Sequence, residues 1–328
     1  MDKRYVPPEI GIVDYSGVQA AAVLGMTDFL VTAEVMARKH MAENLPMLRV
    51  SHWKRTGTAA DAERTFDTGP EFEGGRPAVI VVPPGLGAPI PETEARGYAE
   101  WLLNEHSQGT TLCSICKGAF LLGETGLLAG RTVTTHWSYE EELISRFPGV
   151  IVDIDRLIID GGDILTAGGV MSWIDVSLKL IECFLGPAIM LNTARAFLVD
   201  PPGREQSYYT TFLPRLNHAD QSILKVQHWL QAGDGEEMRL TAMAKFAGLE
   251  KRTFMRRFQR ATGLSTGEYV QRLRVNKARE LLQFTNDPID MVAWKVHYRD
   301  PSAFRKVFTR IVGLTPAEYR ARFRLQVT

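Results

Sequence analysis

The sequence predicts an α/β body, in which helices flank a parallel sheet, followed by an all-α domain with two helix-turn-helix units. About the first 200 residues alternate strand-like and helical runs, which is typical of a parallel sheet with helices on both faces. The last 90 or so contain one short helical pattern twice. From Asp220 onward the chain holds 20 Lys and Arg against 11 Asp and Glu, whereas the rest holds 18 against 27. An acidic body therefore precedes a basic C-terminal domain, which favours a polyanionic partner.

Each element of the body follows from its hydrophobic periodicity and from the turn residues that bound it. Ala78–Val82 is a continuous apolar run stopped by Pro83 and Pro84, as expected for a strand buried on both faces. By the same criteria we expect strands over 9–15, 47–53, 78–82, 110–115, 150–154, 156–159 and 164–167, and helices over 18–40, 92–106, 118–128, 138–147 and 172–199.

The repeated pattern of the C-terminal domain is a short helix, a turn and a second, basic helix. The second helix has two phenylalanines four residues apart, Phe254 and Phe258 in the first copy and Phe304 and Phe308 in the second. This spacing places each pair on one buried face. Gly248 readily supplies the left-handed backbone that ends the first helix of the first copy. Helices are expected over 240–247, 250–261, 289–296 and 301–311, with a long connecting helix over 268–284.

Composition narrows the class of protein further. The N-terminal segment, Met1 to Pro8, lacks the apolar core of a signal peptide, and no apolar run is expected to reach membrane-spanning length. Three cysteines in 328 residues do not form a disulfide framework. The seven histidines are dispersed, and Cys116 with His136 gives two ligands rather than the three or four that zinc needs. We therefore expect a cytoplasmic protein with no membrane partner, no metal and no cofactor.

A second motif lies in the body, where Cys113-Ser-Ile-Cys116-Lys117-Gly118 joins an apolar strand to a helix. Gly118 permits close backbone approach, and the positive end of the helix dipole is expected to lower the pKa of the Cys116 thiol. Residues three apart in a strand lie about 10 Å apart, so a disulfide between Cys113 and Cys116 is not expected. Cys113 is expected to be a small buried residue, and Cys183 is expected to lie in the core.

From about Glu9 to Leu185 the sequence resembles the PfpI type of the class I glutamine amidotransferase-like fold. The resemblance rests on the cysteine motif, on Gly126-Leu-Leu-Ala-Gly130-Arg131 and on Thr134-Thr135-His136-Trp137. It implies that Cys116 occupies a sharp strand-to-helix turn, the nucleophile elbow, with His136 near the same pocket. The expected ligand-binding residues are therefore Cys116, Lys117 and His136.

Enzymes of this group, such as isonitrile hydratases, carry an acidic residue in the first strand–helix region. When Gly17 and Gly25 are aligned with the glycines of that region, Ala22 takes the position of the acid, and Met26 stands where proline is usual. A cysteine without a positioned acid or base is a weaker general catalyst. We therefore assign no catalytic residue, and interpret the body as a retired enzyme scaffold that uses its pocket for binding.

From about Ser222 to Phe323 the sequence resembles the DNA-binding domain of the AraC family of bacterial transcription regulators. The resemblance rests on two units at this spacing, each closed by a Gly-Leu-Ser/Thr-x-x-Glu-Tyr turn. It implies that both second helices enter successive major grooves on one face of DNA. The second unit has His297 and Tyr298 where Gly-Phe is usual, which is expected to strain its turn. The expected DNA contacts are Lys251, Arg252, Met255 and Arg256 in the first unit, and Ser302, Arg305 and Lys306 in the second.

An amidotransferase-like body joined to an AraC-type tail resembles regulators of amino-acid, betaine and carnitine catabolism. It implies a ligand-sensing and dimerisation domain over 1–200, a linker over 201–220 and a DNA-binding domain over 221–328. The expected function is that of a sequence-specific transcription regulator, an activator, that responds to a small molecule. Its expected partners are double-stranded DNA, an amino-acid or quaternary-ammonium effector, a second copy of the chain in a homodimer, and RNA polymerase.

Two alternatives remain open from the sequence. One is a cysteine-dependent hydratase or amidase fused to a DNA-binding domain, for which Asp14 or Asp28 would serve as a displaced acid. The other is a thiol-redox sensor, in which peroxide rather than a metabolite switches Cys116.

Overall fold

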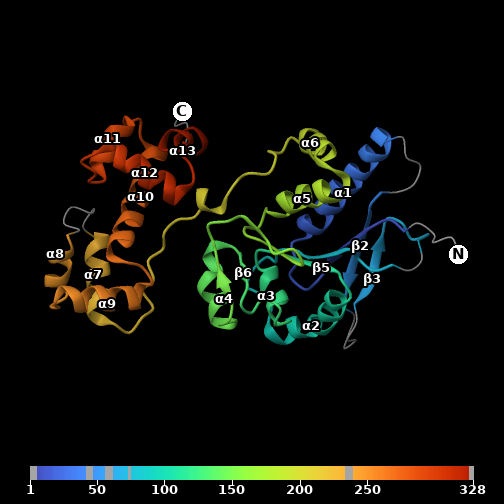
Figure 1. Ribbon diagram of the computed structural model, residues 1–328, viewed down its shortest axis with the longest axis horizontal. Helices are drawn as coiled ribbons and strands as arrows, with labels where there is room; N and C mark the ends of the chain where they lie inside the picture. Colours follow the sequence, from blue (N-terminus) through green and yellow to red (C-terminus); the bar gives the residue numbers. More distant parts are fainter. Residues whose placement is uncertain (1–5, 42–46, 56–61, 73–74, 233–238, 325–328) are drawn as a thin grey trace. The chain divides into compact units, whose positions relative to one another are not determined.

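The computed structural model describes residues 6–41, 47–55, 62–72, 75–232 and 239–324. The chain forms two compact units, Met1–Gln206 and Ser207–Thr328 (Figure 1). The division falls inside the segment 201–220, which is expected to be the linker. The first five residues of the N-terminal segment, for which no signal peptide is expected, lie outside the described residues.

The first unit is built on a seven-stranded sheet whose five inner strands are parallel. The strand order is β3-β2-β1-β4-β5-β9-β8, and the antiparallel strands β3 and β8 form its edges. The predicted α/β fold with a parallel sheet is confirmed. The strands are β1 Glu9–Val13, β2 Arg49–Lys54, β3 Glu63–Asp67, β4 Val79–Val82, β5 Thr111–Ile115, β8 Ile158–Asp160 and β9 Ile164–Ala167, and β6 Thr132–Val133 pairs with β7 Ile151–Val152 in a separate ribbon.

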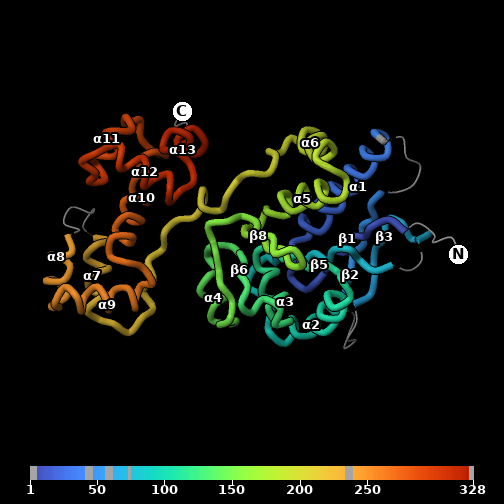
Figure 2. The backbone as a smooth tube through the Cα atoms, viewed as in Figure 1, coloured from blue at the N-terminus to red at the C-terminus, as the bar shows by residue number. Residues whose placement is uncertain are grey.

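Helices cover both faces of the sheet, as Figure 2 shows along the backbone. On one face α1 (Ala20–Met41), α5 (Trp173–Leu185) and α6 (Pro187–Ala196) pack in one apolar core with β1 and β9. On the other face α2 (Glu92–Ser107) and α3 (Gly118–Gly123) pack in a second core. A short helix, α4 (Glu140–Arg146), follows the β6 ribbon strand. The alternation of strand and helix therefore buries the parallel strands on both sides.

Four expectations about the helices of the body are wrong. One helix over 172–199 is expected, but Gly186 at φ +89° separates α5 from α6, and the helix expected over 118–128 ends at Gly123. Cys183 is exposed rather than in the core, because it lies on the outer face of α5. No apolar run of membrane-spanning length is expected, but Ala20–His40 is long and apolar enough to cross a membrane, with a mean hydropathy of 1.5. Half of this helix is buried inside the structure, as in the core helix of a folded domain.

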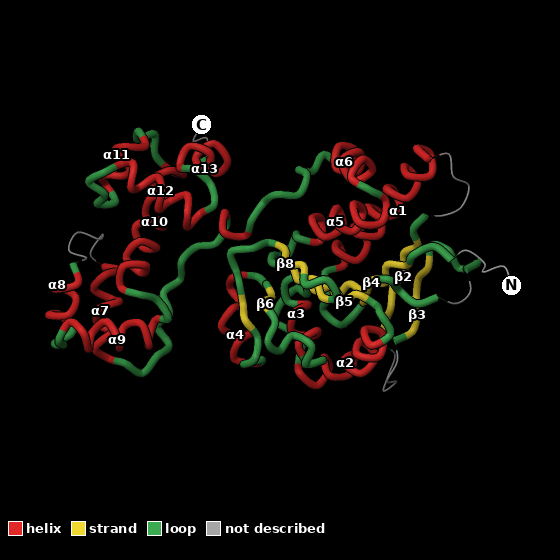
Figure 3. Tube along the Cα trace, viewed as in Figure 1, coloured by secondary structure: helices red, strands yellow, loops and turns green. Residues whose placement is uncertain are grey.

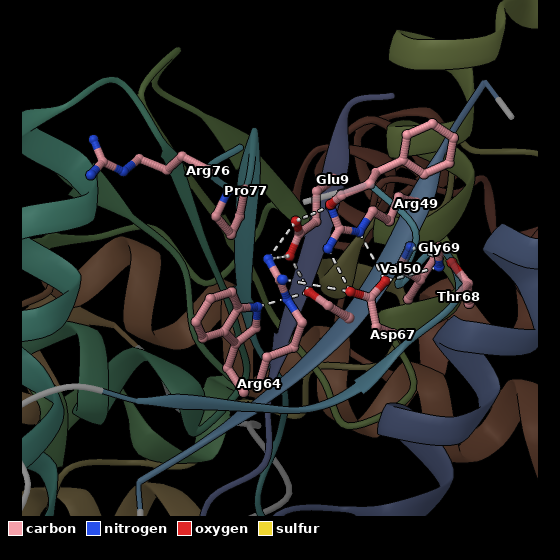
Figure 4. Close-up of polar contacts among 12 residues, drawn as sticks. Glu9, Arg49, Val50, Arg64, Asp67, Thr68, Gly69, Arg76 and Pro77 are labelled. Carbon is pink, nitrogen blue, oxygen red and sulfur yellow. Dashed lines mark hydrogen bonds and ion pairs between the residues drawn. The ribbon is translucent and has the colours of Figure 1, made fainter. Parts of the chain in front are cut away.

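The edge strand β3, which sequence periodicity did not reveal, is held by a buried ionic network (Figure 4). Arg49 on β2 donates to Asp67 through Nε at 2.8 Å, and Arg64 on β3 donates to Glu9 at 2.9 Å. The side chains of Arg49 and Glu9 are 1% and 2% exposed, so each charge depends on its partners for solvation. The network therefore fastens a polar strand to the amino end of β1 and β2.

The second unit consists of helices and loops, with no strand among its described residues (Figure 3). The two predicted helix-turn-helix units and their connecting helix are confirmed. Each unit has a core of its own, centred on Phe254 and Phe258 in the first and on Phe304 and Phe308 in the second. The helices are α7 Gln221–Ala232, α8 Leu240–Phe246, α9 Lys251–Thr262, α10 Thr266–Phe284, α11 Ile289–Lys295, α12 Pro301–Val312 and α13 Pro316–Phe323.

Candidate effector pocket and nucleic-acid interface

Cys116 lies at the sharp turn between β5 and α3. Its backbone has a positive φ of 55°, a conformation that is costly for a residue with a side chain. The turn is held by two hydrogen bonds: the Cys116 amide donates to Ala167 at 2.7 Å, and the Thr135 hydroxyl donates to the Cys116 carbonyl at 2.8 Å. At Gly118 any side chain would overlap the Val82 carbonyl oxygen, so the helix can start this close to β4 only with glycine.

The electrostatics of Cys116 differ from the expectation. Burial raises the pKa of its thiol to about 11, although backbone N–H groups of Lys117, His136 and Gly169 and the Lys117 charge oppose the rise. The expected lowering by the helix end is therefore wrong: the side chain is fully buried, and loss of hydration outweighs the dipole of a helix six residues long. Near neutral pH the sulfur carries its proton and is a poor nucleophile.

The residues at the positions of the hydratase acid and of the usual proline are apolar and enclosed. Ala22 and Met26 lie in the same buried core as Cys116. Asp28 is exposed on α1, and the Asp14 carboxylate accepts from the Lys54 ammonium at 3.0 Å at the surface. Neither aspartate is thus a buried acid like the one that the alignment lacks.

A cavity of about 240 Å³ opens at the carboxyl ends of β1 and β4, where a crevice in a parallel sheet commonly binds ligands. Lys117 lines it, whereas Cys116 and His136 are not among its lining residues. The buried Lys117 ammonium donates to the Gly87 carbonyl and lies 5.3 Å from the centre of the Tyr139 ring. Glu94 also lines the cavity, an acid that the sequence motifs did not indicate, because it comes from α2.

His136 caps the start of the short 3-10 turn Trp137–Tyr139. It does not line the cavity, but the charge of Lys117, which does, acts on its ring. Its Nδ1 accepts from the Ser138 amide at 3.2 Å, so the proton of the neutral ring lies on Nε2. Burial and the Lys117 charge both lower the pKa of His136, and the ring is therefore neutral at pH 7. It can donate one hydrogen bond through Nε2 but is not a cation.

In the second unit, the two helix-turn-helix copies share the same caps and the same ring packing. Helices α9 and α12 end at Gly263 and Gly313, with φ of +76° and +84°. Capping boxes at Ser265 and Thr315 start the helices that follow. The common frame places the second helix of each copy with one face buried and the other exposed.

All seven predicted DNA contacts lie on the exposed faces of α9 and α12. Among the described residues no ion pair holds Arg252 or Arg256, whereas Arg305 is paired with Asp290 of α11. Arg257 is likewise tied to Asp220, with Nη2 2.6 Å from Oδ1. Gln259 and Arg260 are exposed on α9 as well, one helical turn after Met255 and Arg256. That spacing could have indicated them as further candidates for DNA contact. The exposed residues predicted from the sequence are Lys251, Arg252, Met255, Arg256, Ser302, Arg305 and Lys306.

Comparison with known proteins bears on both units. A model of the DJ-1/PfpI family matches residues 24–183, and a model of a helix-turn-helix domain matches residues 243–322. The chain therefore combines a DJ-1/PfpI domain with an AraC-type helix-turn-helix domain. The buried elbow of Cys116 lies within the range that matches the DJ-1/PfpI family, and the basic helices α9 and α12 lie within the range that matches the helix-turn-helix domain.

Among its relatives is the HTH-type transcriptional regulator GlxA of Rhizobium meliloti, 29% identical over 65% of this chain and 66% of the relative. The HTH-type transcriptional regulator GbdR of Pseudomonas aeruginosa is 26% identical over 82% of this chain and 71% of its own length. An isonitrile hydratase of Pseudomonas putida is 29% identical over 54% of this chain and 72% of its own length. The chain thus spans about two thirds of these relatives, and the match to two regulators favours a DNA-binding regulator over an enzyme.

Proposed function

We propose that this AraC-type protein binds double-stranded DNA through α9 and α12 and regulates transcription in response to a small molecule. The observation that carries the proposal is the duplication. The same buried ring cluster and the same caps occur twice, and each copy exposes a basic helix. Selection for a packed core explains the phenylalanines, but the charge excess on both exposed faces fits phosphates and base edges.

The proposed base contacts follow from side-chain chemistry. Arg252 and Arg256 each have a guanidinium that can donate two hydrogen bonds to guanine, the commonest specific contact in the major groove. Met255 is 42% exposed and has no donor, so it would contact a thymine methyl group. In the second unit Ser302, Arg305 and Lys306 take the corresponding role. We propose that Lys251, at the start of α9, contacts a phosphate.

The DNA proposal is tested by selection and titration. The purified full chain selects duplexes from a random pool, and its affinity for the selected duplex and for a scrambled one is measured by fluorescence anisotropy. We expect a difference of about 10³-fold or more in affinity, as for other specific DNA-binding proteins. Equal affinity for both duplexes would contradict the proposal.

We propose that the effector binds in the cavity that Lys117 lines, with Cys116, the preceding residue, and His136, whose ring feels the Lys117 charge, beside the cavity rather than in its lining. The cavity offers a lysine ammonium and the Glu94 carboxylate together, which suits a small molecule with both charges, such as an amino acid, or a quaternary-ammonium metabolite. A thermal-shift screen of the full chain against amino acids, glycine betaine and carnitine tests this. A compound that stabilises the wild type but not Lys117→Met supports the site, and an equal shift in that variant rejects it.

We infer that the DJ-1/PfpI unit is a binding module rather than an enzyme. The inference is supported by the protonated, buried thiol of Cys116 and by the apolar Ala22 at the acid position. The likeness to an isonitrile hydratase makes isonitrile hydration the reaction to assay. Hydration by the wild type that is lost in Cys116→Ala would overturn the inference. The raised pKa also disfavours a peroxide switch, which mass spectrometry of Cys116 after mild peroxide treatment would detect as oxidation.

We further propose that the protein acts in the cytoplasm as a homodimeric activator that contacts RNA polymerase. Two copies on repeated DNA sites would raise affinity through effective concentration. The predicted division into a sensing domain, a linker and a DNA-binding domain assigns dimerisation to the first of these. Sedimentation of the full chain, followed by transcription in vitro from a promoter with the selected sequence, tests both points. A monomer on DNA, or repression of that promoter, would count against them.

A further inference from the structure

The last residue of the first unit, Gln206, has a side chain that is built into that unit. Gln206 is 2% exposed, and its amide nitrogen donates to the carbonyls of Thr135 and Ile154 at 3.0 and 2.8 Å. Its amide oxygen accepts from the Trp137 amide at 2.9 Å. Both ends of one side chain therefore hold the segment Thr134–Trp137, which contains His136 and is called the sensor segment below.

The sensor segment is in turn bonded to the Cys116 elbow. The Thr135 hydroxyl donates to the Cys116 carbonyl, and the Cys116 amide donates a hydrogen bond to the carbonyl of Ala167, the residue before Gly168. Gly168 lies against the Gln206 amide: a Cβ there would lie 2.5 Å from its nitrogen. The seat of Gln206 is thus made by the same two backbone segments that hold the elbow.

Two neighbouring residues reinforce this attachment. Arg204 donates to the buried Asp175 of α5 through Nε at 2.8 Å, and Glu205 accepts from the Leu157 amide at 2.9 Å. Both contacts leave the sensor segment untouched. These contacts join the chain to α5 and to the residues before β8, whereas those of Gln206 reach the sensor segment.

The next residue in the chain, Ser207, is fixed to the second unit. Its carbonyl accepts from Arg279 of α10 at 2.7 Å, and Arg279 is 6% exposed. Ser207 and Tyr208 also lie against Gly313, the glycine that ends α12: a Cβ on it would approach the Tyr208 ring and lie 3.1 Å from the Ser207 hydroxyl. The 3-10 turn Gln206–Tyr208 includes both Gln206 and Ser207.

We propose that Gln206 is the residue through which the effector site and the DNA-binding unit influence each other. This rests on the proposed function, because it requires that the chain binds DNA. A ligand acts only through different affinities for two states. The two states are Gln206 seated in the sensor segment and Gln206 withdrawn, which leaves the Thr135 and Ile154 carbonyls and the Trp137 amide without that partner. Because Ser207 follows Gln206 directly in the chain, withdrawal of Gln206 would shift Ser207. It would thereby change the contacts of Ser207 with Arg279 of α10 and with Gly313 at the end of α12.

Coupling between two sites is reciprocal, so DNA can serve as the probe in place of an unidentified effector. The experiment measures hydrogen exchange of the Trp137 amide in the full chain, with and without a saturating duplex selected from a random pool. In the wild type we expect bound DNA to change this rate about fivefold or more. In Gln206→Glu, whose carboxylate cannot donate to the two carbonyls, the change should fall below about twofold because the link is broken.

Two further variants separate coupling from general damage. Gly168→Ala places a methyl group against the Gln206 amide without altering Gln206, and should also abolish the response. Ser177→Ala removes the buried hydrogen bond from the Ser177 hydroxyl to the Trp173 carbonyl within α5, which does not involve the seat, and should retain the response. A Trp137 rate that ignores bound DNA in the wild type, or a response that persists in both seat variants, overturns the proposal. If the chain selects no duplex, the anisotropy titration reveals that failure separately, and the proposed function falls together with the coupling.

Discussion

In both helix-turn-helix units a phenylalanine packs edge-on against a tyrosine: Phe258 against Tyr269 with ring centres 5.1 Å apart, and Phe308 against Tyr319 at 5.6 Å. The exposed faces are less alike. In α9, Arg252 and Arg256 have no ion-pair partner among the described residues, whereas Arg305 in α12 is paired with Asp290. The two units thus share one core arrangement but differ in their proposed DNA-binding faces. We therefore expect the first unit to contribute more of the DNA affinity.

The turns of the two units differ in a second way. Gly248 in the first turn has φ +66°, and His297 at the matching position of the second has φ +63°. The backbone is thus conserved although the residue is not. Since a left-handed conformation costs a residue with a side chain roughly 1–2 kcal/mol, the expected strain of the second turn is present.

The largest expected effect tests whether the cores are equivalent. Phe258→Ala and Phe308→Ala each remove a fully buried ring, so each should lower the free energy of unfolding by about 3–5 kcal/mol. Urea unfolding of the full chain, followed by hydrogen exchange of α10 amides, measures the loss. Costs that differ by more than about 2 kcal/mol would break the equivalence.

The next effect tests the difference between the exposed faces. Arg256→Ala should weaken binding to the selected duplex by about 1–3 kcal/mol, concentrated at one base position. Arg305→Ala should cost less, under about 1 kcal/mol, because Arg305 must first leave Asp290. Asp290→Ala, the matched variant, should tighten binding by freeing Arg305. Anisotropy titrations on duplexes with single base changes supply the data, and equal losses for both arginines would contradict the assignment.

A smaller effect tests the turns. Gly248→Ala should destabilise the second unit of the chain by about 1 kcal/mol, because alanine resists a positive φ. His297→Gly should stabilise it by about 0.5–1 kcal/mol, since relief of strain exceeds the added entropy of the unfolded chain. Thermal unfolding of the two variants beside the wild type decides; a loss of stability in His297→Gly would show that contacts of the imidazole outweigh the strain.

The smallest effect concerns pH. The hydrogen bond from Arg257 lowers the pKa of Asp220, and that from Lys295 lowers the pKa of Asp287, both from an ordinary value of 3.8. A carboxylate with a lowered folded-state pKa stabilises the fold above its unfolded pKa, and this contribution is lost as pH falls through the folded value. Urea unfolding should therefore show stability declining below about pH 4, and less steeply in Asp220→Asn and Asp287→Asn than in the wild type. Parallel curves for all three proteins would remove the two pairs as a cause.

Much of this architecture could be predicted because it depends on local patterns. The repeat of Phe254 and Phe258 defined both helix-turn-helix units, and the family resemblance carried by the motif around Cys116 implied a sharp turn, which the structure confirms with a positive φ. Gly118 was predicted to allow close approach, and it does so against the Val82 carbonyl. For the repeat and for the turn, the physical constraint lies within a few residues of the signal, and for Gly118 the signal is the glycine itself.

What sequence reasoning missed depends on partners that are distant along the chain. Strand β3 lacks an apolar alternation and is held instead by Arg49 and Glu9. The direction of the pKa shift of Cys116 was predicted wrongly, because burial by the assembled sheet outweighs the local helix end. The contribution of Glu94 to the cavity and the seat of Gln206 likewise required segments more than twenty residues away in sequence. No local motif carries that information.

The most direct measurement is a titration of the full chain against its selected duplex and a scrambled duplex at 50 and 200 mM salt. If the recognition helices of both units contact about six phosphates, affinity for the selected duplex should fall about 10³-fold over this range while the preference over the scrambled duplex persists. Affinity that ignores salt, or that is the same for both duplexes, would contradict the account of two DNA-binding helices on one chain.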